Sequence, residues 1–554
     1  MKLRPLAAAP AVAAVLALVA CAGAFEAPRA HAAPAHATPA NAWPPVWQDA
    51  PAAAPAEFGP AVFAPPSASH CRRPPSTREV PGSGLEQGGA TGGARTRMAA
   101  GVGGAAAGAD VRRKEESSAH LADSAPSRSG PAADASGVPR ESRAGETKSA
   151  AKARPEARSD MAAAPAATVA ASPAPTNREL TPNPTPRPPR PAHETVTAGV
   201  VDDNADFGEY LAYRQRRAGL PVRERDISER YLLEVTDAAG RPVHDAEVAL
   251  QRPGVAQPVM WARTDTAGKV WMHPRAFLVN GLDVSAPGAP TLGTLGVAVR
   301  KHGVQGRAVL VAGQANAVQV RLGVPVATAV PANAPQRPRL DLVFMIDATG
   351  SMGDEIAKLK SSMRAMSQQI SQLPGQPDIC YGLVAYRDRG DAFITRTHDF
   401  TDDLGAFQSM LARVQAGGGG DTPEALNEAL HEVVHRLDWR ADAARMVVMV
   451  ADAPPHLDYG GPQYDKDMQA ALAKGIKLFA VGASGLDPVG EFVFRQMAQY
   501  TAGRFVFLTY RDAADPGSGP GTQTVHDVTQ YSVQTLDRLV VKLVGDEMAR
   551  LNRS

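Results

Sequence analysis

The chain has 554 residues, and its 58 Lys and Arg residues against 57 Asp and Glu residues leave a formal net charge of +1. This balance argues against a basic nucleic-acid clamp, which needs an excess of positive charge, so we expect no nucleic-acid partner. Length alone allows roughly three or four domains of about 150 residues, but the 50 Gly and 48 Pro residues are spread unevenly, so regions of different character are expected.

The N-terminus has the pattern of an export signal. Lys2 and Arg4 precede an apolar stretch that is too short to span a bilayer but suits a signal peptide. The stretch ends in Leu-Val-Ala-Cys, which resembles the lipobox of bacterial lipoproteins. That resemblance implies a signal peptide at residues 1–21, lipidation of Cys21 and, because Ala22 follows, delivery to the outer membrane. An ordinary secretory signal cut nearby is the alternative; in both cases we expect an exported protein, and the lipid anchor is the only expected membrane contact.

Residues 22–194 are rich in Ala, Pro, Ser and Gly and contain very few large aliphatic residues. Ordering a residue costs about 1 to 2 kcal/mol of backbone entropy, and small side chains bury too little apolar area to offset this cost. We therefore expect this region to be a long disordered tether.

The cysteine count limits the chemistry of the chain, because there are only three Cys residues. Beyond Cys21, Cys71 lies in the expected tether and Cys380 in an apolar run. A disulfide between them is open in an oxidising compartment, although the local sequence does not support one, and no thiolate metal site can be built.

The folded part is expected to begin near residue 195. In residues 195–226, Asp206 and Glu209 have the spacing of a capping box and predict one short helix within a linker. Period-two apolar alternation, broken by turn sequences, runs through residues 227–325 and predicts a small all-β sandwich. The phrases VTDAAGRPVHDAEVAL and ARTDTAGKVWM resemble the carboxypeptidase regulatory-like, immunoglobulin-like modules of bacterial surface proteins. That resemblance implies a spacer or adhesion module without catalytic residues.

A proline-rich linker, residues 326–339, leads to a region of alternating character at residues 340–551. Several continuous apolar runs there are typical of strands buried on both faces, namely residues 340–346, 379–386, 446–450, 476–481 and 505–508. Amphipathic segments separate the runs, and a final helix is expected within residues 531–551, after a Gly-rich loop at residues 516–521. This alternation predicts an α/β fold with a doubly wound sheet, in which ligands bind beyond the carboxyl ends of the strands.

Oxygen-bearing side chains fall where these strands end and where a helix is expected to start. The set consists of Asp347, Thr349, Ser351, Thr422 and Asp452. Thr422 follows a run of four glycines, and we expect it to cap a helix that has Pro423 at its first position. Two carboxylates and three hydroxyls form a hard ligand set that suits Mg²⁺, or Mn²⁺ or Ca²⁺, better than zinc.

This set resembles the metal-ion-dependent adhesion site of von Willebrand factor type A domains, which that family writes as DxSxS with a distant Thr and a distant Asp. The resemblance implies that Ser351 and Thr349 bind the metal through hydroxyls. It implies that Asp347 and Asp452 act mainly through water, and that Thr422 acts directly or through water. Thr349 replaces the family's first serine but keeps the hydroxyl. In the family, a carboxylate from a partner protein completes the metal's coordination.

A rival metal motif lies in the same region. His431, Glu432 and His435 spell HExxH, in which two imidazoles one helical turn apart bind zinc and the glutamate acts as general base. Helical periodicity puts four aliphatic residues on the buried side, so we expect the motif residues to face water. No Glu occurs between Glu432 and Glu491, so the usual third ligand of such a peptidase is missing.

Together these features predict a non-enzymatic lipoprotein of the cell envelope, whose metal-dependent domain acts in adhesion or scaffolding. The expected partner is a protein that offers a carboxylate, and the sequence does not set the oligomeric state. Two alternatives stay open. One is a zinc metallopeptidase that uses His431, Glu432 and His435, and the other is a structural envelope lipoprotein with a vestigial metal site.

Overall fold

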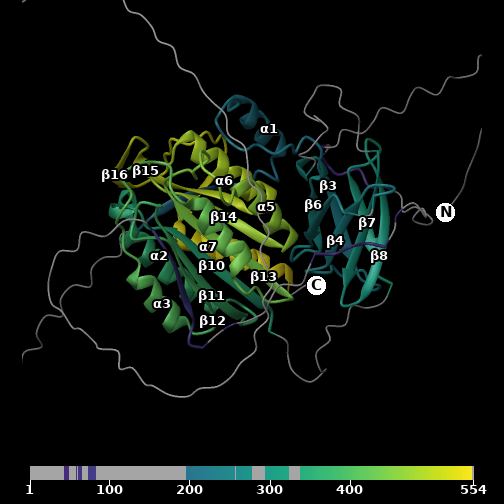
Figure 1. Ribbon diagram of the computed structural model, residues 1–554, viewed down its shortest axis with the longest axis horizontal. Helices are drawn as coiled ribbons and strands as arrows, with labels where there is room; N and C mark the ends of the chain where they lie inside the picture. The colour runs from purple at the N-terminus through teal and green to yellow at the C-terminus, as the bar shows by residue number, and fades with distance from the viewer. Residues whose placement is uncertain are drawn as a thin grey trace, which may run out of the picture. The chain divides into compact units, whose positions relative to one another are not determined.

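A computed structural model shows how the folded parts of the chain are built (Figure 1). It describes residues 41, 43–48, 58, 60–64, 71, 73–82, 195–255, 257–277, 293–323 and 337–551. The predicted signal peptide at residues 1–21, including Cys21, lies outside the described residues. So do residues 83–194 of the predicted tether and residues 324–336, which hold most of the predicted proline-rich linker.

The largest sheet has ten strands, and its centre is parallel. Along the sheet the strands are β1 (Thr77–Pro81), β12 (Phe393–Thr401), β11 (Asp378–Tyr386), β10 (Arg339–Asp347), β13 (Ala443–Ala451), β14 (Ile476–Gly482), β15 (Arg504–Asp512), β2 (Thr197–Val201) and β17 (Ser532–Thr535), with β16 (Asp515–Pro520) paired to β15. The five strands from β11 to β15 in this order run parallel, and the strands outside them pair antiparallel. The predicted α/β fold is therefore confirmed.

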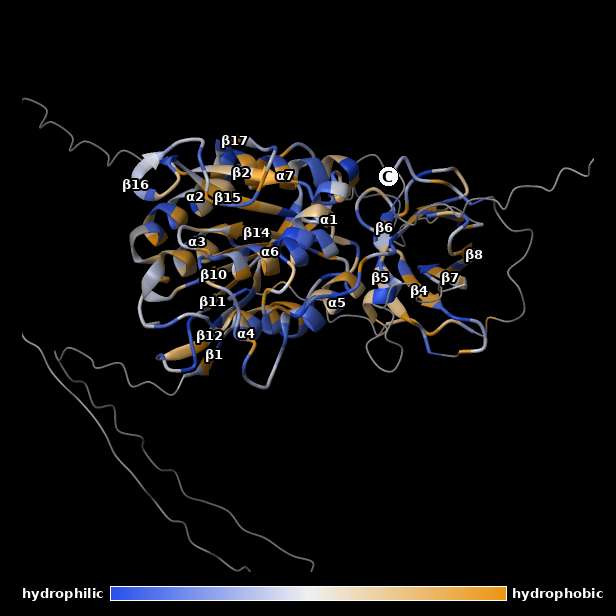
Figure 2. Ribbon diagram, turned by 90° about the horizontal axis from the view of Figure 1, so that it is seen from above, coloured by the Kyte–Doolittle hydropathy of each residue, from blue (hydrophilic) through white to orange (hydrophobic). Residues whose placement is uncertain are grey.

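Continuous apolar runs form these central strands because both of their faces are covered by helices. On β10, Leu342 and Phe344 pack into one buried cluster, while Val343 and Met345 pack into another on the opposite face. The first face is covered by α2 (Gly353–Ser371), α3 (Leu404–Arg413) and α7 (Leu536–Leu551). The second is covered by α4 (Leu426–His431), α5 (Tyr464–Ala473) and α6 (Pro488–Tyr500). Hydrophobic residues accordingly gather along the strands between these helices (Figure 2).

The predicted capping box forms. Asp206 is the N-cap of α1 (Phe207–Arg216), and its side chain accepts a hydrogen bond of 3.3 Å from the backbone N–H of Glu209. This bond satisfies one of the free N–H groups at the helix start, as the spacing of the two residues predicts.

Two smaller sheets follow α1 in the chain. One is mixed and consists of β6 (Lys269–Met272), β3 (Tyr231–Thr236) and β9 (Ala317–Arg321); the other is antiparallel and consists of β5 (Met260–Arg263), β4 (Glu247–Gln251), β7 (Thr294–Lys301) and β8 (Val304–Val311). Leu233 of β3 and Leu250 of β4 are fully buried in one cluster. A short 3₁₀ helix, Pro274–Phe277, follows β6. These strands lie within residues 227–325, where the alternation predicted β structure.

The prediction of an unstructured tether across residues 22–194 is wrong for several short segments. Strand β1 pairs with the edge strand β12, Trp47 forms a bridge to Ala317, and Phe58 is 7% exposed. The composition argument missed these segments because a strand added to an open sheet edge gains backbone hydrogen bonds that do not depend on its side chains. Single aromatic residues can likewise anchor a chain that has no core of its own.

Two other segments take part in the main sheet that were predicted to be linker or loop. Strand β2 comes from the predicted linker and lies between β15 and β17, and β16 comes from the glycine-rich stretch that was expected to be a loop. Gly199 of β2 has no room for a side chain, because a Cβ there would lie 2.4 Å from the ring of Phe507. Such close approach explains a glycine inside a strand.

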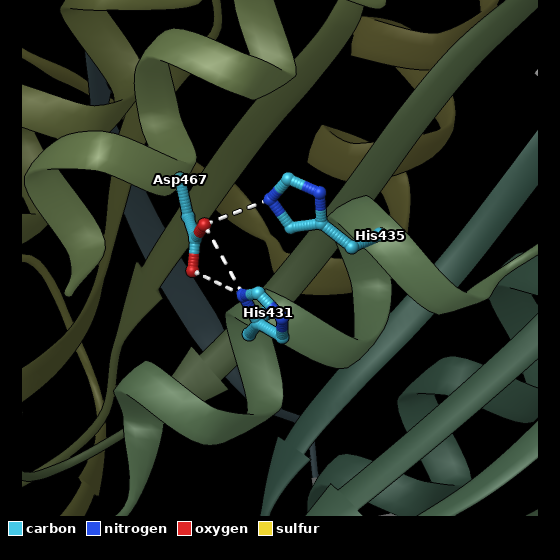
Figure 3. A group of neighbouring side chains, drawn as sticks. All are labelled: His431, His435 and Asp467. Carbon is cyan, nitrogen blue, oxygen red and sulfur yellow. Dashed lines mark hydrogen bonds and ion pairs between the residues drawn. The ribbon is translucent and has the colours of Figure 1, made fainter. Parts of the chain in front are cut away.

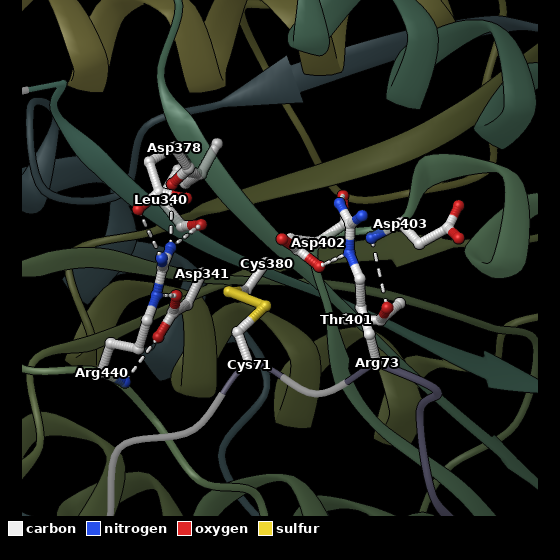
Figure 4. The surroundings of a disulfide bond; sticks show 10 residues. All are labelled: Cys71, Arg73, Leu340, Asp341, Asp378, Cys380, Thr401, Asp402, Asp403 and Arg440. Atoms are coloured by element: carbon white, nitrogen blue, oxygen red, sulfur yellow. Dashed lines mark hydrogen bonds and ion pairs between the residues drawn. A yellow bond between two sulfur atoms is a disulfide. The ribbon is translucent and has the colours of Figure 1, made fainter.

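A disulfide ties β1 to the main sheet (Figure 4). Cys71 lies six residues before β1 and is bonded to Cys380, which is fully buried on β11; the two residues are 309 apart in sequence. Arg78 of β1 also pairs with the buried Asp399 of β12. The disulfide that the sequence left open is thus present, and it holds a segment that has few apolar contacts of its own.

We expect Cys71→Ser to lower the free energy of unfolding by about 2 to 4 kcal/mol, because the disulfide closes a long loop and restricts the unfolded chain. Reduction with dithiothreitol should cost the wild type a similar amount and the variant nothing further, which urea denaturation can measure. Arg73→Ala is the matched control, since Arg73 pairs with Asp402 on the surface and its loss should cost far less stability than loss of the disulfide. A wild type as stable reduced as oxidised would contradict this expectation.

Candidate metal centre

The predicted ligands lie at the place where the strand order of the main sheet reverses. From β10 the chain first adds β11 on one side and later adds β13, β14 and β15 on the other. Asp347 is the last residue of β10, and Asp452 directly follows its parallel neighbour β13. The carboxyl ends of these strands share one edge of the sheet, and open α/β sheets bind ligands in the crevice at such a reversal.

The turn after β10 is held by side chains of the predicted set. The backbone N–H and the hydroxyl of Thr349 donate hydrogen bonds of 3.0 and 2.6 Å to Asp347 Oδ1, and the Thr349 hydroxyl lies 3.1 Å from that of Ser351. A 3₁₀ turn, Gly350–Met352, then leads into α2. Asp347 and Thr349 are fully buried, whereas Ser351 is exposed, so the turn runs from the floor of the site to its rim.

The glycine run at residues 417–420, between α3 and α4, closes over this turn. The backbone N–H of Gly350 donates to the carbonyl of Gly418, and that of Gly417 donates to the carbonyl of Ala348, both at 3.0 Å. A Cβ at Gly350 would lie 2.7 Å from the Gly418 oxygen, and Gly418 has a φ of +73°. The run is therefore glycine because two backbones meet there in a conformation that L side chains rarely adopt.

Thr422 lies at the end of this loop and is exposed, as Ser351 is. The expectation that Pro423 opens a helix is wrong, because α4 begins at Leu426 with Ala425 as its N-cap. Glu424 instead forms a bridge to Pro455, and its backbone N–H donates to the Pro454 carbonyl at 3.0 Å. The chain after Thr422 is therefore extended, and it is hydrogen-bonded to the loop that carries Asp452.

Carboxylate groups are concentrated in the floor of the site. Burial, followed by the charge of Asp452, raises the pKa of Asp347 to about 7, although hydrogen bonds from Thr349 and Tyr386 oppose this shift. Burial also raises the pKa of Asp452, and a hydrogen bond from Ser351 partly offsets this effect. Both shifts have the same cause: removing a carboxylate from water disfavours its charged form.

Oxygen atoms in this floor also lack hydrogen bonds of normal geometry within the described part of the chain. They are Asp347 Oδ2, Asp452 Oδ1 and Glu424 Oε2, although the hydroxyls of Tyr386 and Ser351 lie close enough to lower the pKa of Asp347 and of Asp452, respectively. Buried polar atoms are normally hydrogen-bonded, so each such atom requires an explanation. A hard divalent cation provides one, because carboxylate and hydroxyl oxygens are the ligands that Mg²⁺, Mn²⁺ and Ca²⁺ take. Asp347, Thr349, Ser351 and Asp452, which contact one another or influence one another's pKa, therefore fit such an ion.

Glu424 is a buried carboxylate of this site that the sequence analysis missed. It is 2% exposed, and a Cβ at Gly419 would lie 3.1 Å from its Oε1 and 3.3 Å from the Thr349 Cβ, so the two side chains flank one glycine. Burial, followed by the charges of nearby aspartates such as Asp347, raises its pKa to about 9. The only sequence signal was the position of Glu424 two residues after Thr422. If a helix began at Pro423, as expected, Glu424 would lie in its exposed first turn.

The histidines and the glutamate of the rival HExxH motif contact different partners. His431 and His435 both meet Asp467 of α5, which the sequence analysis did not consider as a ligand. The carboxylate of Glu432 instead lies 3.4 Å from the Thr397 hydroxyl and 3.7 Å from the Arg78 guanidinium. The aliphatic stripe of this helix is buried as predicted, with Leu426, Leu430, Val433 and Leu437 at most 4% exposed.

Within the described part of the chain, every helix is too short or too polar to cross a membrane. Cys21, the predicted lipidation site, lies outside this part.

Comparison with known proteins identifies the main domain. Residues 341–514 match the family described as the von Willebrand factor type A domain. This segment contains β10 to β15 with the helices between them, and it includes all five predicted metal ligands.

The similar proteins match short stretches of the chain. Alpha-protein kinase vwkA of Dictyostelium discoideum is 31% identical over 119 residues, or 21% of this chain and 19% of that protein. The putative ariadne-like RING finger protein R811 of Acanthamoeba polyphaga mimivirus is 32% identical over 119 residues, which are 21% of this chain and 11% of that protein. Human von Willebrand factor A domain-containing protein 7 is 37% identical over 93 residues, which are 17% of this chain and 10% of that protein. The chain thus matches no more than about a fifth of these relatives.

A solved structure was also found. The crystal structure of conserved hypothetical protein BatB from Bacteroides thetaiotaomicron aligns with 39% of this chain and 100% of that chain, at 13% identity and a TM-score of 0.27.

We expect Asp347→Asn to be at least as stable as the wild type in EDTA, because the amide keeps the Oδ1 acceptor for Thr349 and removes a buried charge. Mg²⁺ should stabilise the wild type by about 2.7 kcal/mol at one hundred times its Kd and should not stabilise the variant. Urea denaturation with EDTA or with Mg²⁺ measures both effects. Equal stabilisation of the two proteins by Mg²⁺ would rule out Asp347 as a contributor to the site.

Proposed function

We propose, from the premise that residues 341–514 are a von Willebrand factor type A domain, that the protein is a metal-dependent binding module of the bacterial cell envelope. Such a domain points to protein interaction or adhesion in general. The more specific proposal is that a divalent cation held at one edge of the main sheet captures an acidic residue of a partner protein.

The metal would be held by residues of three loops. Thr349 and Ser351 would offer hydroxyl oxygens, Asp347 and Asp452 would offer carboxylates mainly through water, and Thr422 would approach from the glycine-rich loop. The buried carboxylates support these roles because a cation would compensate their charge and satisfy Asp347 Oδ2 and Asp452 Oδ1. When bound, Mg²⁺, Mn²⁺ or Ca²⁺ supplies a Lewis-acidic position that can accept an oxygen ligand from outside the chain.

The partner would meet the domain at Ser351 and Thr422, which are exposed above the buried floor. Beside Ser351 lies a cavity of about 250 Å³, lined in part by Glu355, Ser484 and Tyr510. The Tyr510 hydroxyl donates to Glu355 Oε1 at 2.6 Å, so this wall of the cavity is polar and fixed. A cavity next to the metal supports recognition of a side chain adjacent to the partner's acidic residue.

Attachment to the envelope is the second part of the proposal. The lipobox-like sequence at Cys21 supports lipidation and outer-membrane delivery, and the Cys71 to Cys380 disulfide supports export, since disulfides persist in oxidising compartments. The two small sheets within residues 227–325 support an immunoglobulin-like module between the anchor and the binding domain.

We do not propose peptidase activity. A general base must lie within hydrogen-bonding reach of the metal-bound water, directly or through one more water. Glu432 contacts Thr397 and Arg78, while the two histidines of the motif face Asp467, so the motif lacks an available base.

The observation that carries the proposal is the closely spaced pair of carboxylates, buried Asp347 and half-buried Asp452, beside the exposed hydroxyl of Ser351. We expect the immobilised wild type to retain proteins from envelope extract in Mg²⁺ and to release them in EDTA. Asp347→Ala should lose this retention by at least about tenfold, because it removes the buried oxygen that orients the metal site.

Asp546→Ala is the matched control, since Asp546 is an exposed carboxylate of α7 paired only with the surface residue Lys542. It should retain the same proteins as the wild type, and circular dichroism should show that both variants are folded. Retention that survives EDTA, or that Asp347→Ala leaves intact, would contradict the proposed function.

A further inference from the structure

Two histidines and one aspartate meet on the helical face opposite the buried stripe of α4 (Figure 3). His431 ends α4, His435 lies in the single π-helical turn Glu432–Arg436, and Asp467 lies in the first turn of α5. One potential ligand atom from each residue lies within 4.8 Å of the other two. The three residues come from two separate helices, so the grouping is a product of the fold and not of the HExxH spacing alone.

The two carboxylate-to-imidazole distances are close to those between the ligands of a tetrahedral metal site. Asp467 lies 3.3 Å from His431 Nδ1 and 2.9 Å from His435 Nε2, and the two imidazole rings are 4.4 Å apart between centroids. Ligands about 2.0 to 2.1 Å from a tetrahedral zinc ion lie about 3.3 to 3.4 Å from one another. The ligand atoms of the three residues, which lie within 4.8 Å of one another, would therefore draw together around an inserted ion.

The chemical types of these three ligands determine which metal ions the cluster would prefer. Two imidazole nitrogens and one carboxylate suit zinc and other late first-row divalent ions, whereas Mg²⁺ and Ca²⁺ prefer sets made only of oxygen. The histidine side chains are 35% and 34% exposed, so an ion can enter from solvent, and Asp467 is 6% exposed and fixed beneath them. This site thus differs in chemistry from the oxygen site at Asp347.

We propose that His431, His435 and Asp467 bind one Zn²⁺ ion, with water as the fourth ligand, at a site that is independent of the adhesion-type metal centre. The site is not catalytic, because Glu432 is engaged by Thr397 and Arg78. It differs from the expected peptidase site in its third ligand, which is an aspartate from the next helix.

Zinc at this position would link α4 and its π-helical turn to α5. These helices follow the loops of Thr422 and Asp452, and Asn427 of α4 already bridges the same elements by donating to the His456 carbonyl at 2.6 Å and accepting from the Tyr464 N–H at 2.8 Å. The Trp439 indole donates to the Val433 carbonyl at 2.9 Å and supports the π-helical turn. Zinc would add a second link at the far end of α4, and we expect it to raise the Tm.

The alternative explanation for this cluster is that Asp467 only accepts hydrogen bonds from the two imidazoles. Metal binding by the full chain separates these explanations. Calorimetric titration with Zn²⁺ in the Asp347→Ala background, which disables the oxygen site, should show one equivalent of bound zinc. His435→Asn should weaken this binding by at least about a hundredfold, since it removes one of three protein ligands and leaves a similar polar side chain.

His302→Asn is the matched control, because His302 is also partly exposed and lies 3.2 Å from a single carboxylate, Asp442. It should bind zinc as the parent does. If His435→Asn does not fold, Asp467→Asn gives the same test at the buried ligand. Co²⁺ added to the parent should give the intense visible spectrum of a four-coordinate site, and His435→Asn should lose it.

Absence of stoichiometric zinc binding, or zinc binding that both His435→Asn and Asp467→Asn leave unchanged, would overturn this proposal. The outcome is separable from the proposed function. His435→Asn should keep Mg²⁺-dependent partner retention if only the zinc site is lost, and Asp347→Ala should keep zinc binding if only the oxygen site is lost.

Discussion

The main domain depends on an electrostatic conflict at the reversal point of its sheet. Asp347 is fully buried, its pKa is raised to about 7, and Asp452 and Glu424 bring further carboxylates to the same floor. A buried charge without a partner is costly, and the proposed cation would offset this cost. The surrounding glycine loop, the turn after β10 and the extended segment after Thr422 are all arranged around this floor.

In the loops of the site, the residues that hold the structure together differ from the residues that would meet a partner. The buried ends, such as Thr349 against Asp347 Oδ1 and Gly350 against Gly418, hold the loops through hydrogen bonds within the protein. The outer ends carry the exposed residues Ser351 and Thr422. A partner that binds at the rim would therefore meet groups already positioned by the floor, which lowers the entropy lost on binding. The histidine and aspartate site on α4 and α5 would stiffen the helices behind two of these loops.

Local sequence was sufficient wherever one segment determines the outcome. The apolar run of β10, the capping box at Asp206 and the buried stripe of α4 all follow from periodicity or spacing. Features that join distant segments were missed. Glu424 and Asp467 become relevant only once other loops and helices are placed beside them, and β1 reaches the sheet edge through backbone pairing and the disulfide at Cys380. Composition and helical period contain no record of such contacts.

Crystals grown with Mn²⁺ and measured near the manganese absorption edge would test the central claim most directly. The account predicts one anomalous peak at the carboxyl edge of β10 and β13, within bonding distance of the Ser351 hydroxyl and between Asp347 and Asp452. A well-ordered site with no manganese there, or with manganese bound only elsewhere on the protein, would contradict it.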